Sequence, residues 1–189
     1  QEAIVKLLDA IHKHRSNNKY VALLTLDASA AFDLLDHSVI SQSLEVTGAG
    51  PLLQKWCASF LAGCKSFVQI GEEESDPWIV ESGSGQGRPL SPDLYNLSTF
   101  SQAIIVSNPD FFNYADDGGD VICGDSIELC NAKIKTVLEQ RIYWYRSMGL
   151  SLNIAKTEIM GFNFKPENIT IGNTSISPKS EITFLGVKI

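Results

Sequence analysis

The stretch YVALLTLD at residues 20–27 is an almost uninterrupted apolar run that leads directly into Asp27. A short run of this kind predicts a central β-strand that is covered on both faces. Because a carboxylate at the end of a buried strand is costly to desolvate, Asp27 is a candidate functional residue. The alternative for an isolated aspartate in front of a helix is a helix N-cap.

A second group of carboxylates lies in residues 111–123, which predict a β-hairpin with its turn at or just after Asp116 and Asp117. Taken alone, such a pair is explained by turn chemistry. Adjacent strand residues point to opposite faces, so we assign Asp116 as the stronger metal ligand and Asp117 as an accessory one. Carboxylate oxygens suit Mg²⁺, and two such ions accelerate phosphoryl transfer by activating the attacking oxygen and stabilising the leaving pyrophosphate.

The rest of the chain predicts one α+β unit, with helices packed on one face of a mainly antiparallel sheet. Helices are expected at residues 3–15, 39–45 and 51–60, from residue 92, and from the hairpin to about residue 147. Strands are expected at residues 66–70 and 78–81, joined by an acidic turn, and near Ile159, Ile169 and Phe184. The expected core side chains outside the central strand are Leu52, Leu53, Trp56, Phe60 and Trp144.

Composition sets the broad class of the protein. The chain has 189 residues, 44% hydrophobic and 20% charged, which is typical of one globular domain. It has no apolar run of membrane-spanning length and no signal sequence, which predicts a soluble protein of the nucleus or cytoplasm without a membrane partner. The four cysteines form no CxxC pair, so free thiols are expected rather than a zinc site: Cys57, Cys64, Cys123 and Cys130.

Five segments, in order along the chain, resemble the motifs of reverse transcriptases, most closely those of LINE-type non-LTR retrotransposons. They are LDASAAFD at residues 26–33, continuing to Asp36 and His37; QGRPLSP at 86–92; YADD at 114–117; GLSLN at 149–153 with Lys156 and Thr157; and FLG at 184–186. The tetrad YADD alone is weak evidence, but five motifs in sequence are strong evidence. The resemblance implies the palm of an RNA-directed DNA polymerase, a nucleotidyltransferase that adds deoxynucleotides to a primer 3′-OH.

The resemblance also implies roles for single residues. The metal ligands would be Asp27, Ala28, Asp116 and Asp117, with Mg²⁺ as the cofactor and Mn²⁺ as a substitute. Lys156 would protonate the leaving pyrophosphate, the alternative being a surface lysine. The implied substrate-binding residues are Phe32, Gln86, Gly87, Ala28 and Tyr114. Of these, Phe32 would exclude a 2′-hydroxyl, the alternative being core packing, and Gly87 would let the backbone approach the template closely.

The implied partners are an RNA template, a DNA or RNA primer and dNTPs. The resemblance covers residues 1–189 as a partial domain, and most of the fingers and the thumb of the parent polyprotein are absent from it. Because the net charge is −7, the cationic grip on phosphates is expected on those segments, and the chain alone is expected to show little or no synthesis. Arg88 and the pair Gly118 and Gly119 depart from the family pattern, and the two glycines are expected to loosen the hairpin.

Two other functions remain to be weighed against reverse transcription. An RNA-dependent RNA polymerase shares the palm, but Phe32 would obstruct a ribose and such enzymes usually carry Gly-Asp-Asp in place of this tetrad. An inactive or domesticated scaffold would be expected to lose its carboxylates, and all three are present: Asp27, Asp116 and Asp117.

Overall fold

The computed structural model describes residues 2–29, 31–85, 87–114 and 117–189, without the side chains of residues 103 and 104. The chain forms two compact units rather than the single unit expected from the sequence. Unit 1 comprises Gln1–Ser29 and Ser101–Ile189, and unit 2 comprises Ala30–Phe100. The reason for the division is that residues of unit 2 pack mainly on one another, through their own helices and hairpins.

Unit 1 is built on an antiparallel sheet. Its strands are β1 (Tyr20–Ser29), β6 (Phe111–Tyr114), β7 (Asp117–Gly124), β8 (Ser151–Leu152) and β9 (Glu158–Gly161). The order across the sheet is β6-β7-β1-β8, and β9 also pairs with β1. Two small hairpins follow, β10 (Ile169–Ile171) with β11 (Thr174–Ile176) and β12 (Thr183–Phe184) with β13 (Val187–Lys188). The expected hairpin, long helix and C-terminal strands are confirmed.

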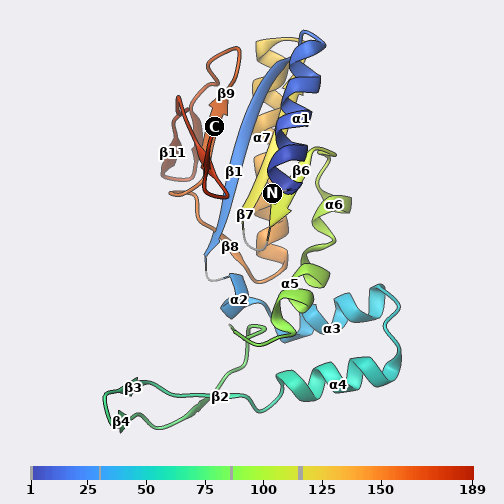
Figure 1. Ribbon diagram of the computed structural model, residues 1–189, viewed down its shortest axis with the longest axis vertical. Helices are drawn as coiled ribbons and strands as arrows, with labels where there is room; N and C mark the ends of the chain where they lie inside the picture. The colour runs from blue at the N-terminus through green and yellow to red at the C-terminus, as the bar shows by residue number, and fades with distance from the viewer. Residues whose placement is uncertain (1, 30, 86, 115–116) are drawn as a thin grey trace. The chain divides into compact units, whose positions relative to one another are not determined.

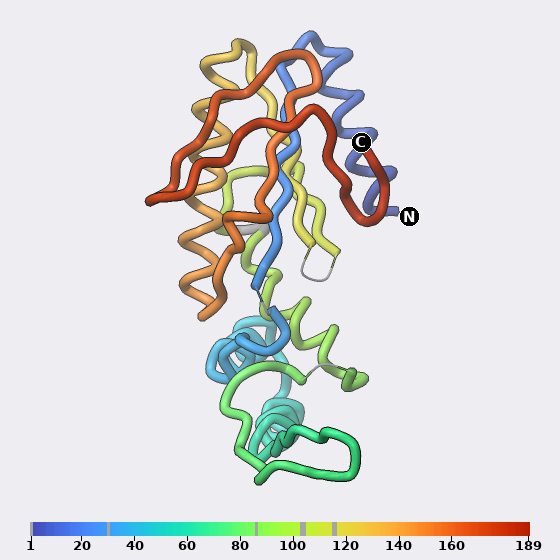
Figure 2. The backbone as a smooth tube through the Cα atoms, turned by 90° about the vertical axis from the view of Figure 1, so that its left-hand side faces the viewer, coloured from blue at the N-terminus to red at the C-terminus, as the bar shows by residue number. Residues whose placement is uncertain are grey.

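Helices cover both faces of this sheet. On one face, α7 (Ile127–Ser147) packs Ile134 and Leu138 against Leu24 of β1. On the other face, α1 (Glu2–Ser16) packs Leu7 against Leu23. In Figure 1, α1 lies in front of the sheet and α7 lies behind it, and the turned view of Figure 2 shows them on either side of β1. The α+β palm with a mainly antiparallel sheet is confirmed. Helices were expected on one face of the sheet; α7 covers one face, and α1 covers the other. Both faces of the apolar part of β1 need a cover, because alternate strand residues point to opposite faces.

The C-terminal hairpin β12–β13 completes the cover on the α1 face. Phe184 is buried in the same cluster as Leu7, with Leu185 and Ile189 packed against it. Figure 2 shows this C-terminal segment beside α1. The two ends of the chain thus share one hydrophobic cluster.

Unit 2 consists mainly of short helices: α2 (Ala31–Leu34), α3 (His37–Val46), α4 (Pro51–Leu61) and α5 (Ser91–Thr99). The remaining short helix of the chain, α6 (Gln102–Ile105), belongs to unit 1. Two ribbons continue from α4: β2 (Lys65–Ser66) pairs with β5 (Trp78–Ile79), and β3 (Gln69–Ile70) pairs with β4 (Glu73–Glu74). The expected pair of strands around an acidic turn is therefore divided into two short ribbons.

The predicted buried face of α4 is wrong. Leu52, Leu53 and Trp56 are 83%, 47% and 51% exposed, while Cys57 and Leu61 of the same helix are buried. Trp56 instead stacks on Phe60, with ring centroids 5.6 Å apart. Helical spacing identifies an apolar stripe, but only a neighbouring element can bury it. The prediction for Trp144 is confirmed, because its side chain is fully buried.

The four cysteines are free, as expected. Cys57 and Cys130 are buried, and burial raises the pKa of the Cys130 thiol to about 11. Within the part of the chain that the structure describes, none of the helices has the length and apolar character to cross a membrane.

Candidate active site

Asp27 and Asp117 lie directly opposite each other on neighbouring strands. The antiparallel register of β1 and β7 pairs Leu23 with Val121 and Asp27 with Asp117. Directly paired residues share one sheet face, and their Cβ atoms are roughly 4.5–5.5 Å apart. Leu23 and Val121 both belong to the cluster beneath α1, so the two carboxylates emerge on that face, beyond the end of the hydrophobic cluster.

This pairing places two negative charges where like charges destabilise a sheet. The Asp27 carboxylate is 27% exposed, and the Lys156 ammonium lies 3.4 Å from both of its oxygens. Lys156 itself is 67% exposed and sits in the turn between β8 and β9. One partly solvated lysine offsets the repulsion only in part, because exposed ion pairs contribute about 0–1 kcal/mol. The arrangement is therefore suited to an additional cation.

The two carboxylates line one cleft of about 560 Å³. Its walls come from the ends of β1 and β7, from the β8–β9 turn with Lys156, and from the segment before and within β12. Lys179 forms an ion pair with Glu158 on this wall. Charged side chains of both signs thus surround Asp27 and Asp117, and the cleft is open to solvent on one side.

The backbone next to Asp27 is held by β8. The Asn153 amide donates to the Asp27 carbonyl oxygen at 2.8 Å, and Ala28 pairs with Leu152. Ala28 is buried, whereas Tyr114 is 66% exposed at the end of β6, opposite Asp117. These contacts fix the end of β1.

Asp116, the ligand that the sequence ranks first, lies outside the described residues. Asp117 is the first residue of β7 and pairs with Tyr114, so the turn of the hairpin does not follow Asp117. Among the described residues, no group of three or more His, Cys, Asp or Glu side chains could hold a metal ion. The carboxylates of Asp27 and Asp117 offer oxygen ligands of the kind that a hard cation prefers, and Glu158 and Glu181 line the same cleft.

The double glycine after the tetrad lies inside β7, where it makes room for aromatic rings. A Cβ atom on Gly118 would lie 3.1 Å from the Phe111 ring, and one on Gly119 would lie 3.1 Å from the Phe184 ring. Both glycines are buried. The rings fill the space that a side chain would take, so the close packing does not support the expectation that the glycines loosen the hairpin.

The predicted sugar-contacting residue lies in unit 2. Phe32, in α2, is partly exposed, and its ring lies on that of the buried Tyr95 in α5, with centroids 4.6 Å apart and planes tilted by 32°. One face of Phe32 is therefore packed against its own unit. The ring is neither a fully buried core side chain nor a free one.

The loop at residues 82–88 is tied to the segment that carries Phe32. Gly83 donates from its amide to Leu35, and the Ser84 amide donates to the Phe32 carbonyl. Gly83 has φ +87°, and a Cβ there would lie 2.7 Å from the Phe32 carbonyl oxygen, so only glycine fits. Gly87 also has positive φ, with open space around it. Gln86 lies outside the described residues.

Arg88, a departure from the family pattern, has a structural role in unit 2. Its guanidinium donates to Cys64 Sγ at 3.0 Å and lies over the Phe60 ring at 5.2 Å. These contacts connect the loop to the C-terminal end of α4.

The sequence reasoning missed Asp120 and Arg141, which are fully buried and form an ion pair behind the hairpin. Two signals were available. Asp120 interrupts the apolar part of β7, and Arg141 continues the helical stripe of Ile134, Val137 and Leu138. When a strand and the helix that follows it each carry a charged residue of opposite sign at a core position, the two residues are candidates for a buried ion pair.

Comparisons with known proteins identify the family. The family model described as reverse transcriptase (RNA-dependent DNA polymerase) matches residues 1–189. A Xenopus laevis protein, "Transposon TX1 uncharacterized 149 kDa protein", is 25% identical over 169 residues, covering 80% of this chain and 13% of the relative. A Pol polyprotein from the type-1 retrotransposable element R2 of Popillia japonica is 27% identical over 94 residues, covering 50% of this chain and 16% of the relative.

A solved structure supports the fold. It is the apo telomerase of Candida tropicalis truncated from its C-terminal domain, with a TM-score of 0.68 and 15% identity, covering 99% of this chain and 37% of that one. The chain thus spans well under half the length of the proteins it matches. The expected likeness to non-LTR retrotransposon reverse transcriptases is confirmed, and this chain belongs to the reverse transcriptase (RNA-dependent DNA polymerase) family.

Proposed function

We propose that this chain is the catalytic palm of an RNA-directed DNA polymerase that adds deoxynucleotides to a primer 3′-OH on an RNA template. The observation that carries the proposal is the direct pairing of Asp27 with Asp117 in an open cleft that also contains Lys156. Family membership supports the reaction class, and the charge distribution of the cleft supports a cation-dependent phosphoryl transfer.

Asp27, Asp116, Asp117 and the Ala28 carbonyl would hold two Mg²⁺ ions, or Mn²⁺ in their place. When bound, the ions would supply electrostatic stabilisation to the attacking and leaving oxygens. The chain's own contribution is to hold the carboxylates of Asp27 and Asp117 on one sheet face. Lys156 lines the same cleft, with its Nζ 3.4 Å from Asp27 Oδ1, and from there it would donate a proton to the departing pyrophosphate.

Unit 2 would supply the contacts that select the substrate. Phe32, which is partly exposed, would meet the incoming sugar, while Tyr95 packs against its ring. Gln86 and Gly87 would lie against the template and the nascent pair, and the open space at Gly87 is compatible with that role. Tyr114, exposed beside Asp117, would contact the primer end.

Residues 1–189 would form a partial domain of the polymerase. Its net charge of −7 leaves the phosphate grip to fingers and thumb segments of the parent polyprotein. The isolated chain should therefore bind primer–template weakly and extend it poorly. We place the reaction inside the cell, where RNA template and dNTPs are available.

The decisive experiment is primer extension on an RNA template with the longest available polypeptide that contains this chain. Asp27→Asn and Asp117→Asn should each lower kcat/KM at least roughly a thousandfold, because each removes charge stabilisation of several kcal/mol. Asp76→Asn is the matched control, since Asp76 is exposed in unit 2. Near-normal extension by Asp27→Asn would refute the assignment of the site.

A further inference from the structure

We propose that the buried ion pair of Arg141 and Asp120 positions the β6–β7 hairpin so that Asp117 faces Asp27. Arg141 and Asp120 would then be positioning residues for nucleotidyl transfer. The inference rests on the proposed function for its catalytic meaning. Its structural basis is a chain of direct contacts from α7 to the residue next to Asp117.

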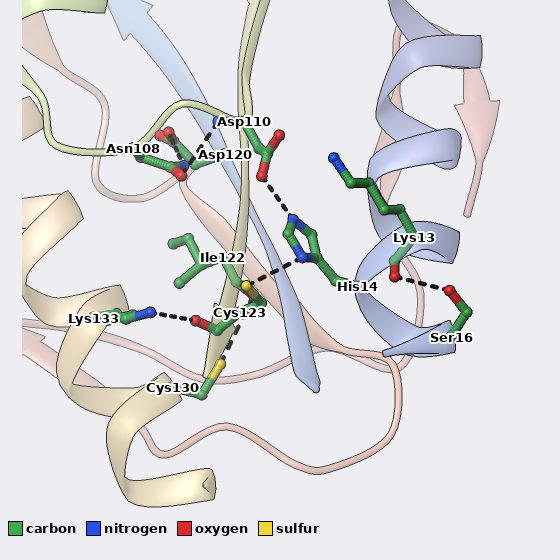
Figure 3. Close-up of polar contacts among 10 residues, drawn as sticks. All are labelled: Lys13, His14, Ser16, Asn108, Asp110, Asp120, Ile122, Cys123, Cys130 and Lys133. Atoms are coloured by element: carbon green, nitrogen blue, oxygen red, sulfur yellow. Dashed lines mark hydrogen bonds and ion pairs between the residues drawn. The ribbon is translucent and has the colours of Figure 1, made fainter. Parts of the chain in front are cut away.

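The pair is completely enclosed and bidentate. Both side chains are 0% exposed; Arg141 Nε donates to Asp120 Oδ2 at 3.0 Å, and Arg141 Nη2 donates to Oδ1 at 2.8 Å. Arg141 Nη1 donates to Gln102 Oε1 at 2.8 Å. Asn108 Nδ2 adds a further hydrogen bond to Asp120 Oδ1, also at 2.8 Å (Figure 3). Parallel hydrogen bonds of this kind fix the relative orientation of the two groups as well as their distance.

Contacts run from this pair to the catalytic end of the hairpin. The Arg141 guanidinium carbon lies 3.5 Å from the centroid of the Phe111 ring, and Phe111 is paired with Asp120 across β6 and β7. The same ring also packs on Gly118, where an added Cβ would lie 3.1 Å from it. Gly118 is the residue next to Asp117 in the chain. A shift of Arg141 would therefore reach Asp117 through two packed contacts, that of Arg141 with Phe111 and that of Phe111 with Gly118.

A purely stabilising role is a weak explanation for such a pair. Desolvation of both charges largely offsets their attraction, and apolar replacements of similar volume are often as stable. The hairpin has a second polar contact on the α1 face, a hydrogen bond in which His14 Nε2 lies 2.7 Å from Asp110 Oδ2 (Figure 3). The side chains of that contact are 18% and 31% exposed, whereas those of Arg141 and Asp120 are fully enclosed. The enclosed pair is therefore the better candidate for setting the position of the carboxylate.

The test separates fold stability from carboxylate position with the double variant Asp120→Leu/Arg141→Met in the polypeptide used for primer extension. Mn²⁺ binding is measured by electron paramagnetic resonance, thermal melting gives the stability, and primer extension gives the Mg²⁺ midpoint. Arg146→Met is the matched control, because Arg146 is exposed on the same helix. We expect the double variant to stay folded but to melt at a lower temperature, because Gln102 and Asn108 lose their hydrogen-bond partners, and we expect Mn²⁺ affinity and kcat each to fall at least roughly tenfold.

Arg141→Lys is the second variant, since it keeps the charge but lacks the planar fork. It should melt close to the wild type and still bind Mn²⁺ more weakly. Wild-type Mn²⁺ affinity in a folded Arg141→Lys protein, or in a folded double variant, would overturn the proposal. If the wild type binds Mn²⁺ but extends no primer, the proposed function fails, while weaker Mn²⁺ binding by the variants still supports the positioning role.

Discussion

The two units of this chain bury their apolar side chains to different degrees. In unit 1, β1 is enclosed between α1 and α7, and Leu23 and Leu24 are fully buried on its opposite faces. In unit 2, α4 and the ribbons that follow it expose large apolar side chains, among them Leu52 at 83% and Ile70 at 78%. The unit that carries the paired carboxylates is the tightly packed one, as expected for a site that requires fixed geometry.

The largest effect on stability should come from truncating the central strand. Leu24→Ala should lower the free energy of unfolding by about 2–5 kcal/mol, because it removes a buried side chain and leaves a cavity. Leu52→Ala, the same change on the exposed face of α4, should alter it by less than about 0.5 kcal/mol. Urea denaturation measures both. Equal losses would show that the contrast between the units is wrong.

A glycine pair tests the same contrast by overpacking. A Cβ atom at Gly124, in β7, would lie 2.6 Å from the backbone nitrogen of Cys130, whereas Gly50, before α4, has open space around it. Gly124→Ala should therefore destabilise the protein by about 1–3 kcal/mol. Gly50→Ala meets no steric clash and should cost less, about 0.5 kcal/mol, because alanine is a poorer N-cap of α4 than glycine. A tolerated Gly124→Ala in the same denaturation assay would mean that the start of α7 can move away from β7.

Phe32 tests whether unit 2 selects the sugar. Phe32→Val should raise the use of ribonucleotides relative to deoxynucleotides at least roughly tenfold, or about 1.4 kcal/mol, because it removes a clash with the 2′-hydroxyl. The measurement is the ratio of kcat/KM values for the two sugars in primer extension. Leu34→Val, at an exposed position of the same short helix, is the control. An unchanged ratio would assign Phe32 to packing on Tyr95 alone.

The smallest effect concerns the N-cap of α3. The Ser38 amide donates to Asp36 Oδ1 at 2.7 Å, and hydrogen bonds from the side chain and the backbone of Ser38 lower the pKa of the Asp36 carboxyl. Asp36→Ala should cost about 0.5–1 kcal/mol at pH 7. A lowered pKa means that the contribution is present above the unfolded-state pKa and is lost as the pH falls through the folded-state pKa. The difference between variant and wild type in urea denaturation should shrink from pH 7 to pH 3; a constant difference would contradict the cap.

Local signals in the sequence were sufficient for most elements. The helix before residue 20, the apolar strand into Asp27 and the helix that ends at Ser147 follow from hydrophobic periodicity and length. The motif order was sufficient for the family, because five motifs in one order are improbable by chance. These properties depend on residues close together in the chain.

The tertiary structure alone decided which residues meet. The register that places Asp117 opposite Asp27 depends on β1 and β7, which are about ninety residues apart in sequence. The exposed stripe of α4 has the same helical spacing as a buried one, so its exposure depends on whether another element covers it. The ion pair of Asp120 and Arg141 likewise requires a strand and a helix to bury both charges together. A sequence pattern states which side chains need a partner, but the packing of distant segments determines which partner each one obtains.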